Sequence, residues 1–340
     1  MAQQILDMIK NNIRKITRTG TLLAAAAFVI TALHAEPQKP GEKPDRDSTV
    51  RVMSYNACRG GTYQGQPLSQ SSKMIELAKA DIVGLQEIGA NVEELAKLLG
   101  WNHSGPFLTH YEIVEHVTGM GKRPWDGIKV KLPSGQHAYV FNAHLPNPPN
   151  QAYQLMGLKG GYRSYPKIDT EEEAIAGAKK TRGKYIARLL KLIKSFAVTD
   201  APIFVVGDFN EPSHLDWTEA AAQAGHHPIK VEFPTSLMMA QAGFTDSYRK
   251  VHPDEVAKPG LTWSPVHAPD HPDHHHMRID YVYFKGEGLK VIDAKVIGEN
   301  EENADIVVAP YPSDHRAVVA TITFAKQTKS GKPEKQETDK

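Results

Sequence analysis

The sequence predicts an α/β fold, a four-layer α/β sandwich in which two packed mixed β-sheets are flanked by helices. Short runs of β-branched and aromatic residues alternate with helical stretches along the chain. Frequent turn signals divide these runs into two hairpin-rich halves. Several of the runs also carry an acidic, amide or imidazole side chain at their ends, as Ile203–Asn210 does. Because a rigid sheet presents such groups together, we expect one site assembled from most of the chain.

The N-terminus predicts export. Four basic residues precede the apolar run Thr21–Leu33, and small or neutral residues follow it around Ala35. This pattern is typical of a signal peptide over residues 1–35, and the run is short for a transmembrane helix. An uncleaved anchor is the alternative, and either outcome puts the rest of the chain outside the cytoplasm, secreted or periplasmic. After cleavage we expect no stable membrane insertion.

Loss of the signal peptide also changes the charge. The whole chain carries a net charge of +1, and residues 1–35 carry four basic residues and one acid, so the remainder has a charge of about −2. A slightly acidic protein has no broad electrostatic surface for a polyanion. Nucleic acid is therefore not the favoured partner.

The rest of the chain is expected to form one domain. Residues 36–47 and 326–340 are polar and charged, which predicts a flexible linker and a disordered tail. Between them no repeat or second linker interrupts residues 48–325, so we expect a single domain and a monomer. The single cysteine, Cys58, excludes an intramolecular disulfide and a cysteine-based zinc site.

Helices and strands can be placed in order along this domain. The expected helices cover Met74–Ala80, Val92–Leu99, Thr170 to about Phe196, and Trp217–Ala224. The helix at Thr170 begins with capping-box spacing to Glu173. The expected strands cover Val52–Asn56, Ile82–Leu85, Ile128–Leu132, Gln136–Asn142, the run Ile203–Asn210, Ile279–Tyr283 and Ala317–Phe324.

Six short motifs carry the chemically active side chains. They are Ser54-Tyr55-Asn56, Leu85-Gln86-Glu87, Asn142-Ala143-His144-Leu145, Gly207-Asp208-Phe209-Asn210, Arg278-Ile279-Asp280-Tyr281 and Ser313-Asp314-His315. In this order they resemble the endonuclease/exonuclease/phosphatase superfamily, which has the deoxyribonuclease I-like fold and includes neutral sphingomyelinases and inositol polyphosphate phosphatases. A single Gly-Asp-Phe-Asn motif would be weak, but six ordered motifs over nearly the whole domain are specific.

The residue types agree with hydrolysis of a phosphate ester. This reaction needs charge neutralisation at the phosphoryl oxygens, an activated water and a stabilised leaving oxygen. Carboxylates and amides favour a hard divalent cation, Mg²⁺ first, with Mn²⁺ or Ca²⁺ as alternatives. Glu87 is the best candidate ligand, and the resemblance adds Asn56 beside it. Asp314 is either a second metal ligand or a residue that positions His315.

The remaining catalytic candidates form two groups. His315 is expected to pair with Asp280, whose carboxylate would fix the imidazole tautomer. The resemblance implies that His315 is the general base or a donor to the phosphoryl oxygen. It makes Asp208 the competing base, with Asn210 orienting it or the transition state. His144 resembles the additional histidine of the sphingomyelinase and phosphatase branches, which helps to hold or protonate the phosphate.

The predicted substrate is a small phosphodiester or phosphomonoester, such as a sugar phosphate or a lipid headgroup. The aromatic and neutral segment Pro146–Tyr165 is expected to be a specificity loop. An extracellular nuclease is the first alternative, and a non-catalytic metal- or ligand-binding protein on the same fold is the second. The candidates for phosphate contact are Arg59, Arg163, Arg182 and Arg278, and we expect at least half of them to be ordinary surface or packing residues.

Two further segments bear on function. The segment His267–His276 is rich in histidine, and a solvated loop is favoured over a transition-metal site. The segment 101–114 is shorter than the resemblance implies, by about one strand and its turn. Such a loss would expose a sheet edge beside Glu87, open the substrate groove, or mark a chain without activity.

Overall fold

The computed structural model describes residues 48–117, 127–158, 165–196, 201–264 and 275–324. All of them belong to one compact unit, Pro44–Lys340. The predicted signal peptide, the linker, the tail, Arg163 and most of the His-rich segment lie outside the described residues. Among the described helices, none has the length and apolar character that a membrane span requires.

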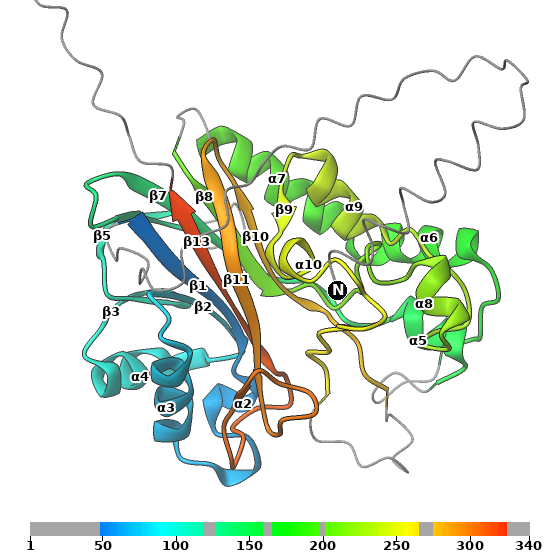
Figure 1. Ribbon diagram of the computed structural model, residues 1–340, viewed down its shortest axis with the longest axis horizontal. Helices are drawn as coiled ribbons and strands as arrows, with labels where there is room; N and C mark the ends of the chain where they lie inside the picture. Colours follow the sequence, from blue (N-terminus) through cyan, green and yellow to red (C-terminus); the bar gives the residue numbers. More distant parts are fainter. Residues whose placement is uncertain (1–47, 118–126, 159–164, 197–200, 265–274, 325–340) are drawn as a thin grey trace, which may run out of the picture. The chain divides into compact units, whose positions relative to one another are not determined.

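Two mixed sheets form the centre of this unit (Figure 1). The seven-stranded sheet has the order β12 (Ile306–Val307), β11 (Leu289–Gly298), β13 (Ala317–Phe324), β1 (Thr49–Asn56), β2 (Ile82–Gln86), β4 (Phe107–Thr109) and β3 (Asn102–Ser104). The six-stranded sheet has the order β5 (Glu112–Val117), β6 (Gly127–Lys131), β7 (His137–His144), β8 (Ile203–Asp208), β10 (Asp280–Lys285) and β9 (Thr245–Asp246). Parallel pairs such as β1 with β2 and β7 with β8 occur beside antiparallel pairs in each sheet.

The two sheets pack face to face around a buried apolar core. Val52 and Ile82 of the first sheet belong to the same core cluster as Val140 and Val206 of the second. At Gly84 the sheets come so close that an added Cβ would lie 2.2 Å from a methyl group of Val206. A glycine is therefore required in β2 where it crosses the second sheet.

Helices cover the outer faces of both sheets, which confirms the predicted four layers. The helices α3 (Leu68–Ala78) and α4 (Val92–Leu99) pack on the outer side of the seven-stranded sheet. The helices α7 (Lys184–Phe196) and α9 (Pro234–Gln241) pack on the six-stranded sheet. The shorter helical elements are α2 (Cys58–Gly61), η2 (Tyr63–Gly65), η3 (Gly89–Asn91), α5 (Gln151–Met156), α8 (Glu219–Gln223) and α10 (Ser247–Val251).

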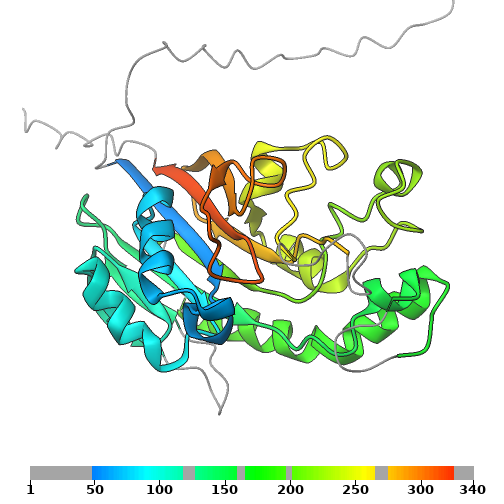
Figure 2. The ribbon, with the colours of Figure 1, turned by 90° about the horizontal axis from the view of Figure 1, so that it is seen from below.

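The predicted long helix is present as three consecutive helical segments (Figure 2). It consists of α6 (Glu171–Ala178), a π-helical turn η4 (Lys179–Gly183) and α7. The capping box between Thr170 and Glu173 is present, as predicted. The π-helical turn carries Arg182 into the protein interior, and such turns often mark functional or strained positions.

The expected loss of a strand next to Glu87 is wrong. The strands β3 and β4 form a short hairpin, and β4 pairs with Ile82–Gly84 of β2. The strand β2 therefore has neighbours on both sides, and β3 is the edge of the sheet. Strands of three residues leave too little sequence to show a period of two, which explains why they were not predicted.

Candidate active site

The sheet topology brings the motif residues to one end of the two sheets. Asn56 ends β1 in register with Gln86 of β2, immediately before Glu87. In the second sheet, Asp208 lies in register with His144 on one side and with Asp280 on the other. The hydrophobic side chains of these strands fix them in the core. The packed sheets therefore hold the polar side chains at the strand ends close together.

Asp208 is the centre of the cluster. Its side chain is 1% exposed and accepts hydrogen bonds from the backbone N–H of Asn210 (2.8 Å) and from the side-chain amides of Asn210 (3.1 Å) and Asn56 (3.0 Å). The Nε2 atoms of His144 and His315 lie 3.6 Å and 3.8 Å from the same carboxylate. Burial raises the pKa of Asp208 to about 6, although the charge of His315 opposes this shift.

His315 forms the predicted pair with Asp280. Its Nδ1 lies 3.0 Å from Oδ2 of Asp280, and Nε2 is directed toward Asp208. Burial alone would lower the pKa of His315, but the carboxylates of Asp280 and Asp208 outweigh this and raise the pKa to about 10. The imidazole therefore carries two protons at neutral pH.

Two residues that were not predicted hold this pair in place. Ser313 accepts a hydrogen bond from the backbone N–H of His315 and donates one to the carbonyl of Asn56, at 3.1 Å and 2.6 Å. The hydroxyl of Thr262 accepts bonds from two successive backbone N–H groups, those of Ile279 and Asp280. Both act through backbone atoms, and a sequence pattern gives no signal for such contacts.

Glu87 occupies the open side of the cluster. Its side chain is 41% exposed, and its carboxylate lies 3.4 Å from the side-chain nitrogen of Asn56 and 3.8 Å from Nε2 of His144. The backbone of Glu87 has φ +57° and that of Asn210 has φ +49°. Left-handed conformations are costly for residues other than glycine, and both occur in this cluster.

Asn56 presents its amide nitrogen to the site. The amide oxygen accepts a hydrogen bond from the backbone N–H of Cys58 (3.1 Å), so the N–H groups face Glu87 and Asp208. This orientation favours a role in fixing the two carboxylates. A role of Asn56 as a metal ligand stays a prediction.

Asp314 lies beside Cys58, and its charge also helps to raise the pKa of His315. It hydrogen-bonds the Cys58 thiol, and burial together with the charge of Asp314 raises the pKa of that thiol. A raised pKa leaves little thiolate, which disfavours Cys58 as a nucleophile.

The donor set fits a hard divalent cation. Asp208, Asp280 and His315 form a buried group whose nitrogen and oxygen atoms lie within 4.8 Å of one another. Because His315 keeps both ring protons, the ligand atoms of this group are the oxygens of the two carboxylates. Oδ1 of Asp280 is buried and has no hydrogen-bond partner among the described residues. Together with the exposed carboxylate of Glu87, these oxygen atoms are the ligands that Mg²⁺ and Mn²⁺ prefer.

Two of the arginines predicted to contact phosphate are engaged elsewhere. Arg182 is fully buried and pairs with Glu211 at 2.7 Å. Arg278 pairs with Asp216 and Asp246 at 2.9 Å and 2.8 Å. Of the described candidates, only Arg59 has an exposed side chain. This agrees with the expectation that at least half of the candidate arginines are surface or packing residues, because the guanidinium groups of Arg182 and Arg278 pair with internal carboxylates.

A cavity of about 320 Å³ adjoins the open side of the cluster. It is lined by Leu85, Gln86, Glu87, Ile88, Gly89, Val92, Gly105, Pro106, Asn142, Ala143 and His144. Most of these side chains are small or apolar, and the cavity reaches both Glu87 and His144. Clefts of this size accommodate small ligands.

The far side of His315 is aromatic. The ring of Trp263 lies 6.4 Å from that of His315, and Tyr153 packs against Trp263 at 5.7 Å. His275, at the described end of the His-rich segment, lies 6.2 Å from Tyr153. The predicted specificity segment thus contributes a buried tyrosine next to the site.

Two packed mixed sheets, with carboxylates, amides and histidines gathered at one end, define a protein of the deoxyribonuclease I-like class. The chain belongs to the endonuclease/exonuclease/phosphatase family, which matches residues 53–315. It is also 30% identical over 301 residues to the uncharacterized protein F14F9.5 of Caenorhabditis elegans, a match that covers 81% of this chain and 91% of that protein.

Solved structures show the same fold. The 3′ phosphatase NExo from Neisseria, bound to a product DNA hairpin, has a TM-score of 0.52 and 18% identity, and the match covers 81% of this chain and 99% of that chain. A family protein from Beutenbergia cavernae DSM 12333 has a TM-score of 0.51 and 17% identity, with coverage of 82% and 72%. An AP endonuclease from Archaeoglobus fulgidus has a TM-score of 0.50 and 17% identity, with coverage of 81% and 99%. At these identities the likeness shows the fold.

Proposed function

We propose that this family member is a divalent-metal-dependent phosphoesterase that hydrolyses a small phosphodiester or phosphomonoester, such as a sugar phosphate or a lipid headgroup. The observation that carries the proposal is the buried Asp208, which contacts Asn56 on one side and lies 3.8 Å from the His315–Asp280 pair on the other. One carboxylate thus links the Glu87 side of the cluster to the imidazolium side.

Asp208 is the general base in this proposal. With a pKa near 6 it is ionised at neutral pH and can accept a proton from the attacking water. Asn210 holds the carboxylate with two hydrogen bonds, which fixes the direction of its free lone pairs. Because His315 keeps its proton, its Nε2–H donates to a phosphoryl oxygen as negative charge develops there.

A bound divalent cation would supply positive charge for the phosphoryl oxygens and the leaving oxygen. Glu87 is the carboxylate most open to such an ion, and Asp208 and Asp280 lie behind it. His144, 37% exposed and between Glu87 and Asp208, is in reach of a phosphate held at the same place.

The cavity beside Glu87 supports a small substrate. Its volume of about 320 Å³ and its mostly apolar lining suit one compact organic group on the phosphate. The slightly acidic charge of the chain beyond residue 35 supports the same preference over a polyanion.

Hydrolysis of two model esters tests the proposal. The purified protein is incubated with bis(p-nitrophenyl) phosphate or p-nitrophenyl phosphate in EDTA, Mg²⁺, Mn²⁺ or Ca²⁺, with plasmid DNA as a third substrate. We expect metal-dependent release that His315→Ala lowers by about 10²- to 10⁴-fold. The exposed histidine variant His103→Ala is the matched control and should keep the wild-type rate. Salt-sensitive plasmid cleavage far faster than ester hydrolysis would instead support a nuclease.

We further propose that residues 1–35 direct export and are removed. The expected result is a protein in the secreted or periplasmic fraction whose mass corresponds to a chain that begins at residue 36. A membrane-bound protein of full mass would support the anchor instead.

A further inference from the structure

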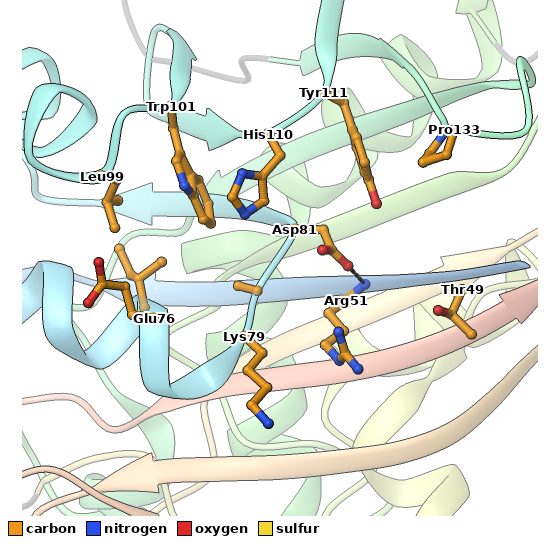
Figure 3. A pocket seen from close by; sticks show the side chains of 12 residues that line it. Thr49, Arg51, Glu76, Lys79, Asp81, Leu99, Trp101, His110, Tyr111 and Pro133 are labelled. Carbon is orange, nitrogen blue, oxygen red and sulfur yellow. Dashed lines mark hydrogen bonds between the residues drawn. The ribbon is translucent and has the colours of Figure 1, made fainter. Parts of the chain in front are cut away.

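A second cavity lies at the other end of β1 and β2, away from the candidate active site (Figure 3). Its volume is about 610 Å³, within the range of small-molecule sites. Arg51 lines this cavity and precedes Asn56 by five residues on β1, which at about 3.3 Å per residue separates the two sites by roughly 17 Å.

One side of the cavity is aromatic. Trp101, His110 and Tyr111 lie next to one another along this side in Figure 3. The rings of Trp101 and His110 are in contact, with centroids 3.9 Å apart. Their backbone is held as well, since the N–H of His110 bonds the carbonyl of Asp81 and the amide of Asn102 bonds the carbonyl of Tyr111. The aromatic side is therefore a fixed surface that a ligand can use at little entropic cost.

The opposite side carries balanced charge. Arg51 and Lys79 lie across from the aromatic residues in Figure 3, with Asp81 between the two sides. Glu76 is the other charged residue of the lining, so the lining contains two cations and two carboxylates and has a net charge of zero. Asp81 is fixed by a 2.7 Å hydrogen bond from the backbone N–H of Arg51.

Lys79 reaches this position at a conformational cost. It ends α3 with φ +53°, in the left-handed region where glycine is the usual residue at the end of a helix. A glycine there would relieve the strain and remove a cation from the cavity.

We propose that this cavity binds a neutral, polyhydroxylated ring, that is, a sugar unit of a glycan. Hydroxyl groups both donate and accept, and the cavity offers guanidinium and ammonium donors together with carboxylate acceptors. The apolar face of a sugar ring packs on an aromatic surface such as Trp101. Phosphate and quaternary ammonium ligands fit less well, because each would meet two like charges in a cavity of zero net charge.

The position of this cavity allows it to bind a ligand without blocking the candidate active site. A sugar bound beside Arg51 leaves the opposite end of β1, with Asn56 and Glu87, open to substrate. The cavity would hold the protein on a glycan-bearing surface while the candidate active site stays accessible.

Titration with neutral disaccharides tests the proposal. Cellobiose, lactose and N,N′-diacetylchitobiose are titrated into the full-length protein by calorimetry and by saturation-transfer NMR. We expect at least one to bind with a Kd of about 1 mM or tighter, and Trp101→Ala to weaken it at least about tenfold. Because Trp101→Ala could perturb the fold, Lys79→Gln is a second variant and should also weaken binding. Lys97→Gln, on exposed α4, is the matched control and should not.

Three results would overturn the proposal. The first is that none of the disaccharides binds at a concentration of about 10 mM, ten times the expected upper limit of the Kd. Another is sugar binding that neither Trp101→Ala nor Lys79→Gln weakens, which would put the sugar elsewhere. The third is binding of inorganic phosphate, AMP or choline that Trp101→Ala abolishes, which would assign the cavity to a different ligand class.

Discussion

Asp208 and His315 have pKa values displaced in the directions that their proposed roles require. Burial raises the pKa of Asp208 to about 6, and two carboxylates raise that of His315 to about 10 against the opposite effect of burial. Between these values Asp208 is ionised and His315 is protonated. An environment that separates two pKa values in this way supports the proposed roles of Asp208 as base and His315 as acid.

A pH profile checks this assignment. We expect kcat/KM on bis(p-nitrophenyl) phosphate to rise as Asp208 loses its proton near pH 6 and to fall as His315 loses its proton near pH 10. Asp280→Asn removes a charge that raises the pKa of His315, so the alkaline limb should move to lower pH. Asp293→Asn, an exposed carboxylate on β11, is the control and should leave the profile unchanged. An alkaline limb that stays in place in Asp280→Asn would contradict the proposed pairing.

At the scale of elements, the π-helical turn η4 is joined to the end of β8 by one buried ion pair. Arg182 bonds Glu211 at 2.7 Å, the carbonyls of Pro146 and Asn147, and the side-chain oxygen of Gln151. Glu211 directly follows Asn210, so the pair connects the segment after His144 with the loop that orients Asp208. Arg182 thus acts by positioning these elements.

Removal of one partner of this pair should be strongly destabilising. Arg182→Ala leaves the carboxylate of Glu211 buried without its ion-pair partner, although the backbone N–H of Thr235 still donates to it, and we expect a loss of about 3–5 kcal/mol in the free energy of unfolding. Urea denaturation followed by circular dichroism measures it. Lys180→Ala, an exposed position on the same turn, should change the free energy by no more than about 0.5 kcal/mol. Equal changes in the free energy of unfolding for the two substitutions would show that the buried ion pair contributes no more to stability than an exposed side chain.

The elements also show what the sequence could predict and what it could not. Strands such as β8 and β10 were predicted because each is an unbroken apolar run, which can be identified from its own residues without knowledge of the neighbouring strands. The ten-residue β11 was missed, and its irregular pairing between Val291 and Asp293 interrupts the alternation on which such predictions depend. The sequence predicted that at least half of the candidate arginines are surface or packing residues, but it could not tell that Arg278 is one of them, because it does not show which carboxylates lie beside a guanidinium group.

At the scale of the whole domain, the candidate active site is a junction between the two sheets. Glu87 and Asn56 come from the seven-stranded sheet, whereas Asp208, His144 and Asp280 come from the six-stranded sheet. The order of the six motifs predicted this gathering, since the fold implied by the resemblance brings the strand ends together. An ion or substrate held by both groups would bind only when the sheets are packed.

Metal binding should therefore stabilise the folded domain as a whole. A ligand that binds only the native state stabilises it by about 2.7 kcal/mol at one hundred times its Kd. We expect Mg²⁺ or Mn²⁺ to raise the Tm above its value in EDTA. Glu87→Gln should abolish the increase because it removes the most exposed carboxylate of the cluster. The control Glu94→Gln, exposed on α4, should keep the increase in Tm.

The same measurement separates the enzyme from a metal-binding protein on this fold. An increase in Tm that survives Glu87→Gln would place the ion at other ligands, and the histidines of the segment 267–276 would then be the first residues to replace.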